Sequence, residues 1–240
     1  MIKAIIKHLV LGLALAGFFQ LAYAQEATIR KNLAERIPQL PKIDEITKTP
    51  MDGLYEIRIN GTEIYYTDAQ ANYLVQGSLF DTRQKRNLTE ERIEKLTAIS
   101  FDSLPMKDAF TIVRGNGKRK VAVFADPNCG FCKRFERDLL KIDNVTVYLF
   151  LYPILGADST EKSKNIWCAK DKAKVWNDWM FNGTVPAGAS CDTAALTRNV
   201  EFGQKQRITG TPTVFFSDGK RVPGAISAEQ IEKNLVSAGG

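Results

Sequence analysis

Apolar residues in the first third of the chain recur first at a helical and then at an alternating period. The helical period spans 26–37, where three apolar side chains share one face: Ile29, Leu33 and Ile37. Alternation then predicts three strands: 54–59, 62–67 and 72–76. Asn60-Gly61 separates the first two and favours a tight hairpin, because both turn positions need a positive φ. The pattern therefore predicts a short helix followed by a small β-rich unit.

A second helix is predicted after this unit. Ile93, Leu96 and Ile99 lie on one stripe, and the acids of Thr89-Glu90-Glu91 suit the positive end of a helix dipole. Two interpretations stay open: the helix connects two domains, or it is an ordinary packed helix. The β-rich unit before it has only about 60 residues, which bury little core alone, and its sheet has open edges. Pairing with a second copy of the chain would bury more apolar surface and would cover the open edges of the sheet.

Beyond residue 104 the pattern changes to alternating strands and helices. Short apolar runs predict four strands: 110–113, 121–125, 145–151 and 213–216. Gly115-Asn116-Gly117 separates the first two and is expected to form a hairpin turn. Helical patterns span 129–140, 158–206 with a loop over 183–190, and a final segment through Leu235 that begins with a Ser227/Gln230 capping box. This alternation is typical of an α/β domain.

The first 24 residues have the pattern of a secretory signal peptide. Lys3 and Lys7 precede an apolar run over 9–19, and Ala22-Tyr23-Ala24 is a small-x-small cleavage site. The run is shorter than the roughly 20 residues of a spanning helix, so we expect cleavage after Ala24 rather than a membrane anchor. An exported protein enters a compartment in which disulfides persist.

Charge and histidine content narrow the possible functions. The chain has 240 residues, and its 33 Lys and Arg only mildly exceed its 27 Asp and Glu. It lacks the basic run with interleaved aromatics that a nucleic-acid groove needs. The single histidine, His8, falls in the predicted signal peptide, which leaves no histidine base, nucleophile partner or metal ligand in the expected mature chain. We expect no nucleic-acid partner, no metal and no cofactor.

The strongest chemical motif is Cys129-Gly130-Phe131-Cys132, which follows one predicted strand and opens a predicted helix. The free N–H groups and dipole of a helix start stabilise a thiolate and lower the pKa of a thiol there. Cys129 is then the expected nucleophile, and Cys132, one turn further, the resolving thiol. The alternatives are a structural bridge or half of a zinc site, and zinc usually needs a second close pair or histidines. We favour redox chemistry.

Two further features carry less specific signals. Gly210-Thr211-Pro212-Thr213 precedes the last predicted strand, and Pro212 is either a strand-edge residue or a cis-proline; the pattern alone favours the first. Cys168 and Cys191 lie in or beside the helical region. If the motif cysteines pair with each other, these two are left as partners; otherwise they are buried thiols.

Several segments, in order along the chain, carry a family resemblance. They are Tyr65-Tyr66-Thr67-Asp68, Gln76-Gly77, Phe124-Ala125-Asp126 before the Cys-Gly-Phe-Cys motif, 166–172, 189–192 and Gly210-Thr211-Pro212. Together they resemble the DsbC/DsbG family of periplasmic disulfide isomerases over nearly the whole expected mature chain. The resemblance is greater to DsbC, because Gly130 stands where DsbG-like proteins carry proline, although Phe131 replaces a frequent tyrosine.

The resemblance implies a mixed α+β and α/β fold in four parts. These are a signal peptide over 1–24, a small α+β N-terminal dimerisation domain over 25–85, a linker helix over 86–104, and a thioredoxin-like catalytic domain with a helical insertion over 105–240. It further implies a homodimer whose two active sites face a shared cleft. The implied site comprises catalytic Cys129 and Cys132, substrate-binding Thr211 and a cis Pro212, and a structural disulfide between Cys168 and Cys191.

The implied activity is the reshuffling of non-native disulfides in misoxidised exported proteins in the periplasm. A membrane reductase of the DsbD type would keep the pair reduced, since the thiolate of an isomerase has to attack wrong bonds. Phe131 cannot supply the positive neighbour that DsbA-type oxidants have in a histidine, so a less oxidising pair is expected. Val123 stands where thioredoxins carry a buried acid, so that proton-transfer group is expected to be missing. The alternatives are a DsbG-like reductase of oxidised single cysteines and a redox-independent holdase chaperone.

Overall fold

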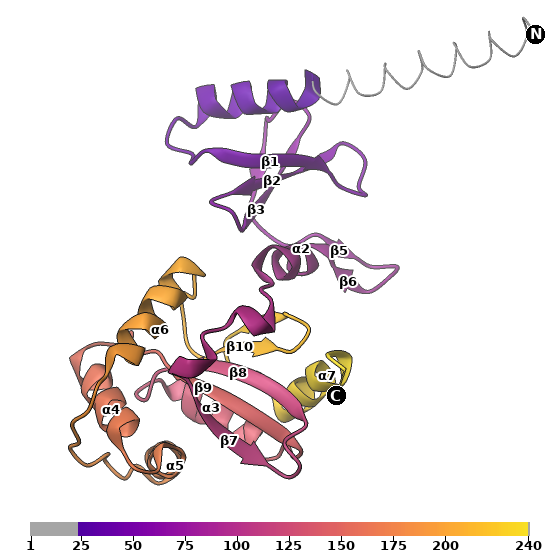
Figure 1. Ribbon diagram of the computed structural model, residues 1–240. Helices are drawn as coiled ribbons and strands as arrows, with labels where there is room; N and C mark the ends of the chain where they lie inside the picture. The colour runs from indigo at the N-terminus through magenta and orange to yellow at the C-terminus, as the bar shows by residue number, and fades with distance from the viewer. Residues whose placement is uncertain (1–23, 240) are drawn as a thin grey trace, which may run out of the picture. The chain divides into compact units, whose positions relative to one another are not determined.

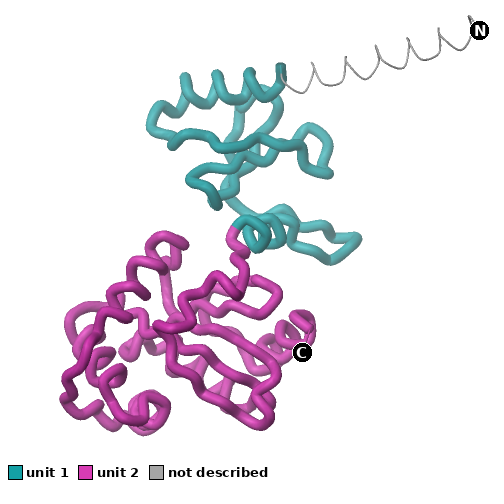
Figure 2. Tube along the Cα trace, in the orientation of Figure 1, with its two compact units in different colours: residues 1–96 teal, residues 97–240 magenta. Residues whose placement is uncertain are grey.

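The computed structural model describes residues 24–239 and divides into two compact units, residues 1–96 and 97–240 (Figure 2). Residues 1–23, which hold most of the predicted signal peptide, lie outside the described part. Within residues 24–239, none of the helices is long and apolar enough to cross a membrane. Both units mix helices with sheet, as the sequence pattern predicts.

The N-terminal unit consists of a helix over residues 24–36 packed on an antiparallel sheet (Figure 1). The sheet has the order β1 (Ile43–Lys48), β2 (Leu54–Ile59), β3 (Glu63–Asp68) and β4 (Leu74–Val75). Ile29 and Leu33 of the helix share one buried cluster with Ile57 and Ile59 of β2. The predicted Asn60-Gly61 hairpin is confirmed, with φ of 50° and 78°. β1 was not predicted, and the strand expected over 72–76 is only two residues long.

A short hairpin of β5 (Phe80–Asp81) and β6 (Arg86–Asn87) leads into helix α2 (Leu88–Thr97). Thr89, in the first turn of α2, is buried and joins two parts of the N-terminal unit. Its Oγ1 lies 2.5 Å from the hydroxyl oxygen of Tyr66 on β3 and accepts the backbone N–H of Leu79 at 2.8 Å. These contacts fix the start of α2 to the sheet.

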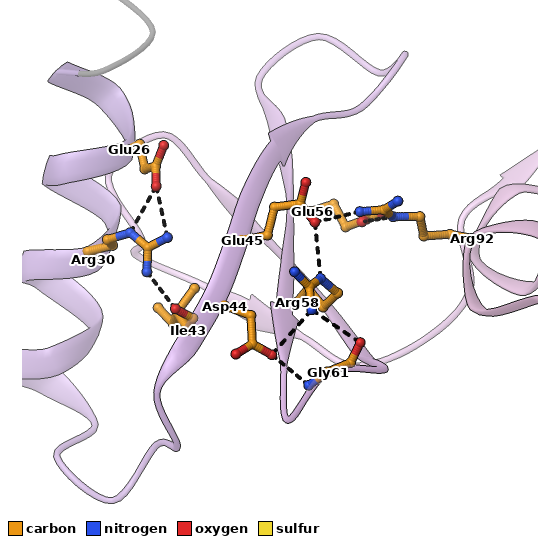
Figure 3. Close-up of polar contacts among 9 residues, drawn as sticks. All are labelled: Glu26, Arg30, Ile43, Asp44, Glu45, Glu56, Arg58, Gly61 and Arg92. Atoms are coloured by element: carbon orange, nitrogen blue, oxygen red, sulfur yellow. Dashed lines mark hydrogen bonds and ion pairs between the residues drawn. The ribbon is translucent and has the colours of Figure 1, made fainter. Parts of the chain in front are cut away.

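An ion-pair network fixes the middle of α2 to the same sheet (Figure 3). Arg92 contacts Glu45 of β1 at 2.6 Å and Glu56 of β2 at 2.9 Å. Arg58 of β2 extends the network, 3.0 Å from Glu45 and 3.5 Å from Asp44. These contacts agree with the interpretation of α2 as a packed helix. The other interpretation, that α2 links two domains, stays a prediction.

The C-terminal unit is built on a five-stranded sheet with the order β11-β10-β8-β9-β7. Its strands are β7 (Phe110–Arg114), β8 (Arg119–Ala125), β9 (Val145–Leu151), β10 (Thr213–Phe216) and β11 (Arg221–Pro223). Its helices are α3 (Gly130–Leu139), α4 (Ala157–Cys168), α5 (Lys172–Asn182), α6 (Ala194–Lys205) and α7 (Ala228–Ser237), and two 3₁₀ turns, η1 (Phe101–Ser103) and η2 (Met106–Asp108), precede β7. The Ser227/Gln230 capping box at the start of α7 is confirmed.

Strand β8 is buried on both faces, which places its end at the centre of this unit. Alternate side chains point to opposite faces of a sheet. Val121 and Val123 accordingly belong to one core cluster with residues of α3, α5 and α7. Ala122 and Phe124 belong to a second cluster, on which Phe202 of α6 packs. The segment that follows β8 therefore emerges from between two packed layers.

The hairpin predicted between 110–113 and 121–125 is wrong, because β9 lies between these two strands. β9 pairs antiparallel with β7 and parallel with β8. Parallel neighbours need a crossover, which α3 supplies, and a strand as apolar as β9 is stable in the interior of a sheet, between two other strands. The Gly115-Asn116-Gly117 turn packs instead on the start of β9, where the Asn116 N–H donates to Oδ1 of Asn144 at 3.0 Å.

Candidate active site

Cys129 is the N-cap residue of α3, the helix that follows β8. Its φ and ψ of −75° and 117° are extended, and its Sγ accepts the backbone N–H of Cys132 at 3.4 Å. The two cysteines are free thiols, and both are buried, with 6% of Cys129 and 1% of Cys132 exposed. The strand-to-helix position predicted for the motif is therefore the one observed.

The pKa values of the two thiols are shifted in opposite directions. The pKa of Cys129 is lowered from 9.0 to about 5 by a hydrogen bond from the Cys132 side chain, the largest cause, together with Thr211 and the helix-start amides, against the effect of burial. Burial and the contact with Cys129 raise the pKa of Cys132 well above its ordinary value. At neutral pH the first cysteine is a thiolate and the second a protonated thiol, which is the division of roles expected for a nucleophile and a resolving thiol.

Sheet register brings the Thr211-Pro212 segment to the same place. β10 runs antiparallel to β8 with Thr213 opposite Phe124, so the residues before β10 lie beyond the end of β8. The Thr211-Pro212 peptide bond is cis, the alternative that the pattern alone did not favour and the family resemblance implied. The carbonyl oxygen of Thr211 lies 3.2 Å from Sγ of Cys129.

Asp126, the first residue after β8, organises the loop that carries Cys129. Its carboxylate is fully buried and accepts the backbone N–H of Asn128 at 2.8 Å. It also accepts the N–H groups of Ile154 and Leu155, in the loop after β9, and the hydroxyl of Ser159, in the first turn of α4. The sequence singled out Asp126 for its family resemblance and assigned no role to this carboxylate.

Helix α5 supports the other side of this loop. The indole N–H of Trp179 donates to the carbonyl oxygen of Pro127 at 2.6 Å. The Nζ atoms of Lys133 and Lys162 lie 4.3 and 4.8 Å from the centre of the same ring. A cation over an aromatic face is attracted by the ring electrons, so these contacts tie α3 and α4 to α5.

A buried acid lies one helical turn beyond Cys132, on α3. Glu136 is 1% exposed, and its Oε1 accepts the indole N–H of Trp176 at 3.0 Å. Its Oε2 has no hydrogen-bond partner within residues 24–239. Burial raises the pKa of Glu136 from 4.5 to about 7, while Trp176 and the positive charge of Arg114 oppose the shift. Sequence reasoning missed this residue, although a charged position on the buried face of α3 is an available signal.

Cys168 and Cys191 form a disulfide. It joins the last residue of α4 to the loop that precedes α6. The two cysteines are 23 positions apart, so the bond closes a loop around α5. Over the described residues, no cluster of three or more His, Cys, Asp or Glu side chains is arranged to hold a metal ion.

The sheet, the pair of thiols at the start of α3 and the cis-proline beside them define a thioredoxin-like thiol–disulfide oxidoreductase. Residues 106–239 match the family model described as a thioredoxin-like domain, and residues 20–90 match that of the disulfide bond isomerase protein N-terminal domain. The chain belongs to the DsbC family of thiol:disulfide interchange proteins, the family to which the sequence motifs pointed.

Two curated relatives and one solved structure establish this membership. The probable thiol:disulfide interchange protein DsbC of Bordetella parapertussis is 43% identical over 211 residues, which are 88% of this chain and 74% of the relative. Thiol:disulfide interchange protein DsbC of Escherichia coli (strain K12) is 30% identical over 228 residues, 92% of each chain. The crystal structure of a disulfide interchange protein from Neisseria gonorrhoeae is 40% identical with a TM-score of 0.54, covering 56% of this chain and 98% of that one.

Proposed function

We propose that this protein is a disulfide isomerase of exported proteins and that Cys129 is its nucleophile. The Cys129 thiolate attacks one sulfur of a non-native substrate disulfide, a mixed disulfide forms, and the other substrate sulfur leaves as a thiolate. That thiolate attacks a second disulfide of the substrate, and a substrate thiolate then displaces Cys129. The pair returns unchanged, and no net oxidation or reduction has taken place.

The single observation that carries this proposal is that the pKa of Cys129 is lowered while the pKa of Cys132 is raised. The low pKa of Cys129 keeps it in the attacking form at neutral pH, and it also makes Cys129 a good leaving group from the mixed disulfide. The raised pKa of Cys132 keeps that thiol protonated and slow to attack. The slow second thiol gives the bound substrate time to rearrange before Cys132 releases it.

When Cys132 does attack, the substrate leaves reduced and a Cys129–Cys132 disulfide remains. An external thiol reductant must then supply two electrons, and we propose a membrane reductase of the DsbD type for this step. We assign Thr211 and Pro212 to substrate binding, because a chain attached to Sγ of Cys129 has to pass the Thr211 carbonyl 3.2 Å away. We assign the Cys168–Cys191 disulfide a structural role.

We further propose that the protein works as a homodimer in the periplasm, on misoxidised exported proteins. Membership of the DsbC family supports the homodimer, and so does the match of residues 20–90 to the isomerase N-terminal domain. The charged start and apolar run at the N-terminus support export, with cleavage after Ala24.

Trapping of the mixed disulfide tests the role of Cys129. With Cys132→Ser, attack by Cys129 continues and resolution is lost, so we expect a covalent complex with a disulfide-containing substrate that a thiol reductant reverses. Peptide mass spectrometry should place the bond at Cys129, and the matched Cys129→Ser variant should trap nothing. Equal trapping by both variants would contradict the proposal.

Two other functions give different results with the same proteins. A reductase of oxidised single cysteines would reduce a sulfenic acid while leaving a scrambled disulfide protein unchanged. A holdase would suppress aggregation of an unfolded protein equally well in a variant that lacks both Cys129 and Cys132. These outcomes separate redox chemistry on disulfides from binding alone.

A further inference from the structure

We propose that Asp126 is a positioning residue that holds Leu155 beside the active-site loop, where Leu155 binds apolar segments of the substrate. The inference rests on the proposed isomerase function and identifies one of its substrate contacts. It is carried by the hydrogen bonds of one buried carboxylate and by the exposure of the side chains that this carboxylate holds in place.

The carboxylate of Asp126 joins two segments that are distant in the sequence. Oδ1 accepts the N–H of Asn128, the residue before the nucleophile, and the hydroxyl of Ser159 at 2.7 Å. Oδ2 accepts the N–H of Ile154 at 2.9 Å and that of Leu155 at 3.0 Å. The loop of Cys129 and the loop after β9 therefore share one buried carboxyl group, and neither can move away without leaving buried hydrogen-bonding groups unsatisfied.

A second contact links the same two segments. The side-chain amide of Asn128 donates to Oδ2 of Asp158 at 2.6 Å and to the hydroxyl of Ser159 at 3.1 Å. Ser159 is fully buried and bonds to both Asp126 and Asn128. Side-chain hydrogen bonds from Asp126 and Asn128 thus hold the start of α4 against the segment that precedes Cys129.

The loop held in this way presents apolar side chains to solvent. Leu155 is 57% exposed and Ile154 37%, although their backbone N–H groups are bound to a buried group. Phe131, between the two motif cysteines, is 62% exposed. Exposed apolar side chains on backbone that is anchored beside the loop of the nucleophile favour a partner that is itself apolar.

The occupant to which we commit is an apolar stretch of an unfolded polypeptide next to its disulfide. A protein with non-native disulfides is not correctly packed, so apolar side chains that flank its cysteines are exposed. A substrate sulfur bound to Cys129 would bring those side chains past the anchored loop. Burial of apolar surface on both partners then contributes to binding without selecting a particular sequence.

The experiment compares two peptides that carry the same intramolecular disulfide, one flanked by leucines and the other by serines. The reduced protein is tested as wild type, Asp126→Asn, Leu155→Ser and the double variant. Asp126→Asn keeps the shape of the side chain but replaces one of its two acceptor oxygens by an NH2 group, which leaves two of the four donors without an acceptor. The matched controls are Asp138→Asn, a half-buried acid of α3 that pairs with Lys141, and Val236→Ser, at an exposed position of α7.

We expect Leu155→Ser to raise the KM for the leucine peptide by about three- to tenfold, while kcat and the rates with the serine peptide change less than about twofold. Asp126→Asn also loosens the loop of Cys129 and should slow both peptides, and in addition it should raise the KM for the leucine peptide relative to that for the serine peptide by a similar factor. The double variant should be no worse than the worse single variant, because Asp126 acts through Leu155. The controls should match wild type. Circular dichroism and the intact Cys168–Cys191 bond serve to check folding of each variant.

Equal losses on both peptides in Asp126→Asn, or additive effects in the double variant, would overturn the positioning role. An unchanged KM in Leu155→Ser would overturn the substrate contact, and this variant tests it even where Asp126→Asn fails to fold. Failure of the wild-type protein to react with either peptide would instead overturn the proposed function. The two failures are therefore distinguishable.

Discussion

Cys132 contacts Sγ of Cys129 through its backbone N–H, at 3.4 Å, and through its side chain, and the side-chain contact shifts the pKa values of both thiols. The side-chain contact is the largest cause of the lowered pKa of Cys129, which reaches about 5. The same contact adds to burial in raising the pKa of Cys132. A single proton between the two sulfur atoms is thus held on Cys132, and the negative charge is held on Cys129 at the helix start.

The shared hydrogen bond predicts a difference between two substitutions of Cys132. Serine can still donate to the Cys129 thiolate and alanine cannot, so the pKa of Cys129 should be higher in Cys132→Ala than in Cys132→Ser. In the wild-type protein, alkylation of Cys129 should accelerate as the pH rises through about 5. The pH dependence of alkylation and the ultraviolet absorbance of the thiolate measure these values. An identical pKa in both variants would refute the role of the side-chain contact.

Glu136 predicts a loss of stability as the pH rises. Its folded-state pKa of about 7 lies above its ordinary 4.5, so the folded protein keeps a proton that the unfolded chain releases between these values. The stabilisation is complete below pH 4.5 and is lost above about pH 7, a change of up to about 3 kcal/mol. Glu136→Gln should lack this component and should gain stability relative to wild type as the pH rises.

Denaturant unfolding with the motif cysteines oxidised measures this effect without interference from their titration. The three tryptophans all lie in the C-terminal unit, so their fluorescence reports its unfolding. Glu201→Gln, which removes an exposed acid of the same unit, is the control and should follow the wild-type curve. A constant difference between Glu136→Gln and wild type at all pH values would show that Glu136 does not titrate in this window.

Removal of the Cys168–Cys191 disulfide should destabilise the C-terminal unit. Replacing both cysteines by alanine frees a loop of 23 positions in the unfolded state, which lowers the free energy of unfolding by about 2–5 kcal/mol. Reaction of the Cys129 thiolate with a small disulfide should be retained, because neither alanine replaces a group that sets the pKa of Cys129. Tryptophan fluorescence during unfolding measures the first effect. An unchanged midpoint of unfolding would contradict the structural role of the Cys168–Cys191 disulfide.

The contact of Thr89 with Tyr66 predicts that α2 contributes to the stability of the N-terminal unit. Thr89→Val leaves the buried hydroxyl of Tyr66 and the N–H of Leu79 without their partner, at a cost of about 1–3 kcal/mol. Hydrogen exchange of β3 and α2 should accelerate together. Tyr73→Phe, at a tyrosine that is 74% exposed, is the control. Faster exchange confined to α2 would indicate that the helix opens independently of the sheet.

Local patterns predicted those elements whose stabilising interactions are local. The Asn60-Gly61 turn, the strand Val145–Leu151 and the Ser227 capping box each follow from a few neighbouring residues, and each is present. The hairpin expected around Gly115-Asn116-Gly117 is wrong, because strand order depends on which apolar strand is buried between two others, and here that strand is β9 between β8 and β7. That choice is made by packing across the whole unit and leaves no signal in the turn.

In the candidate site, too, the sequence predicted the features that depend on neighbouring residues and missed those that depend on distant ones. The motif predicted the positions of Cys129 and Cys132 at the start of α3, since a strand before it and an amphipathic helix after it are visible in the sequence. The cis bond before Pro212 followed from the family resemblance and not from the local pattern. The bonds from Asp126 to the loop after β9 join residues about 30 positions apart in the chain, so no local rule finds them.

The most direct test of the proposed function is the recovery of activity from a scrambled multi-disulfide protein, with a thiol reductant present. Wild type is compared with Cys129→Ser, and both must be folded. We predict that wild type accelerates recovery and that Cys129→Ser does not. Equal recovery with both proteins, or none with a folded wild type whose motif cysteines are reduced, would contradict the role of Cys129 as the nucleophile of a disulfide isomerase.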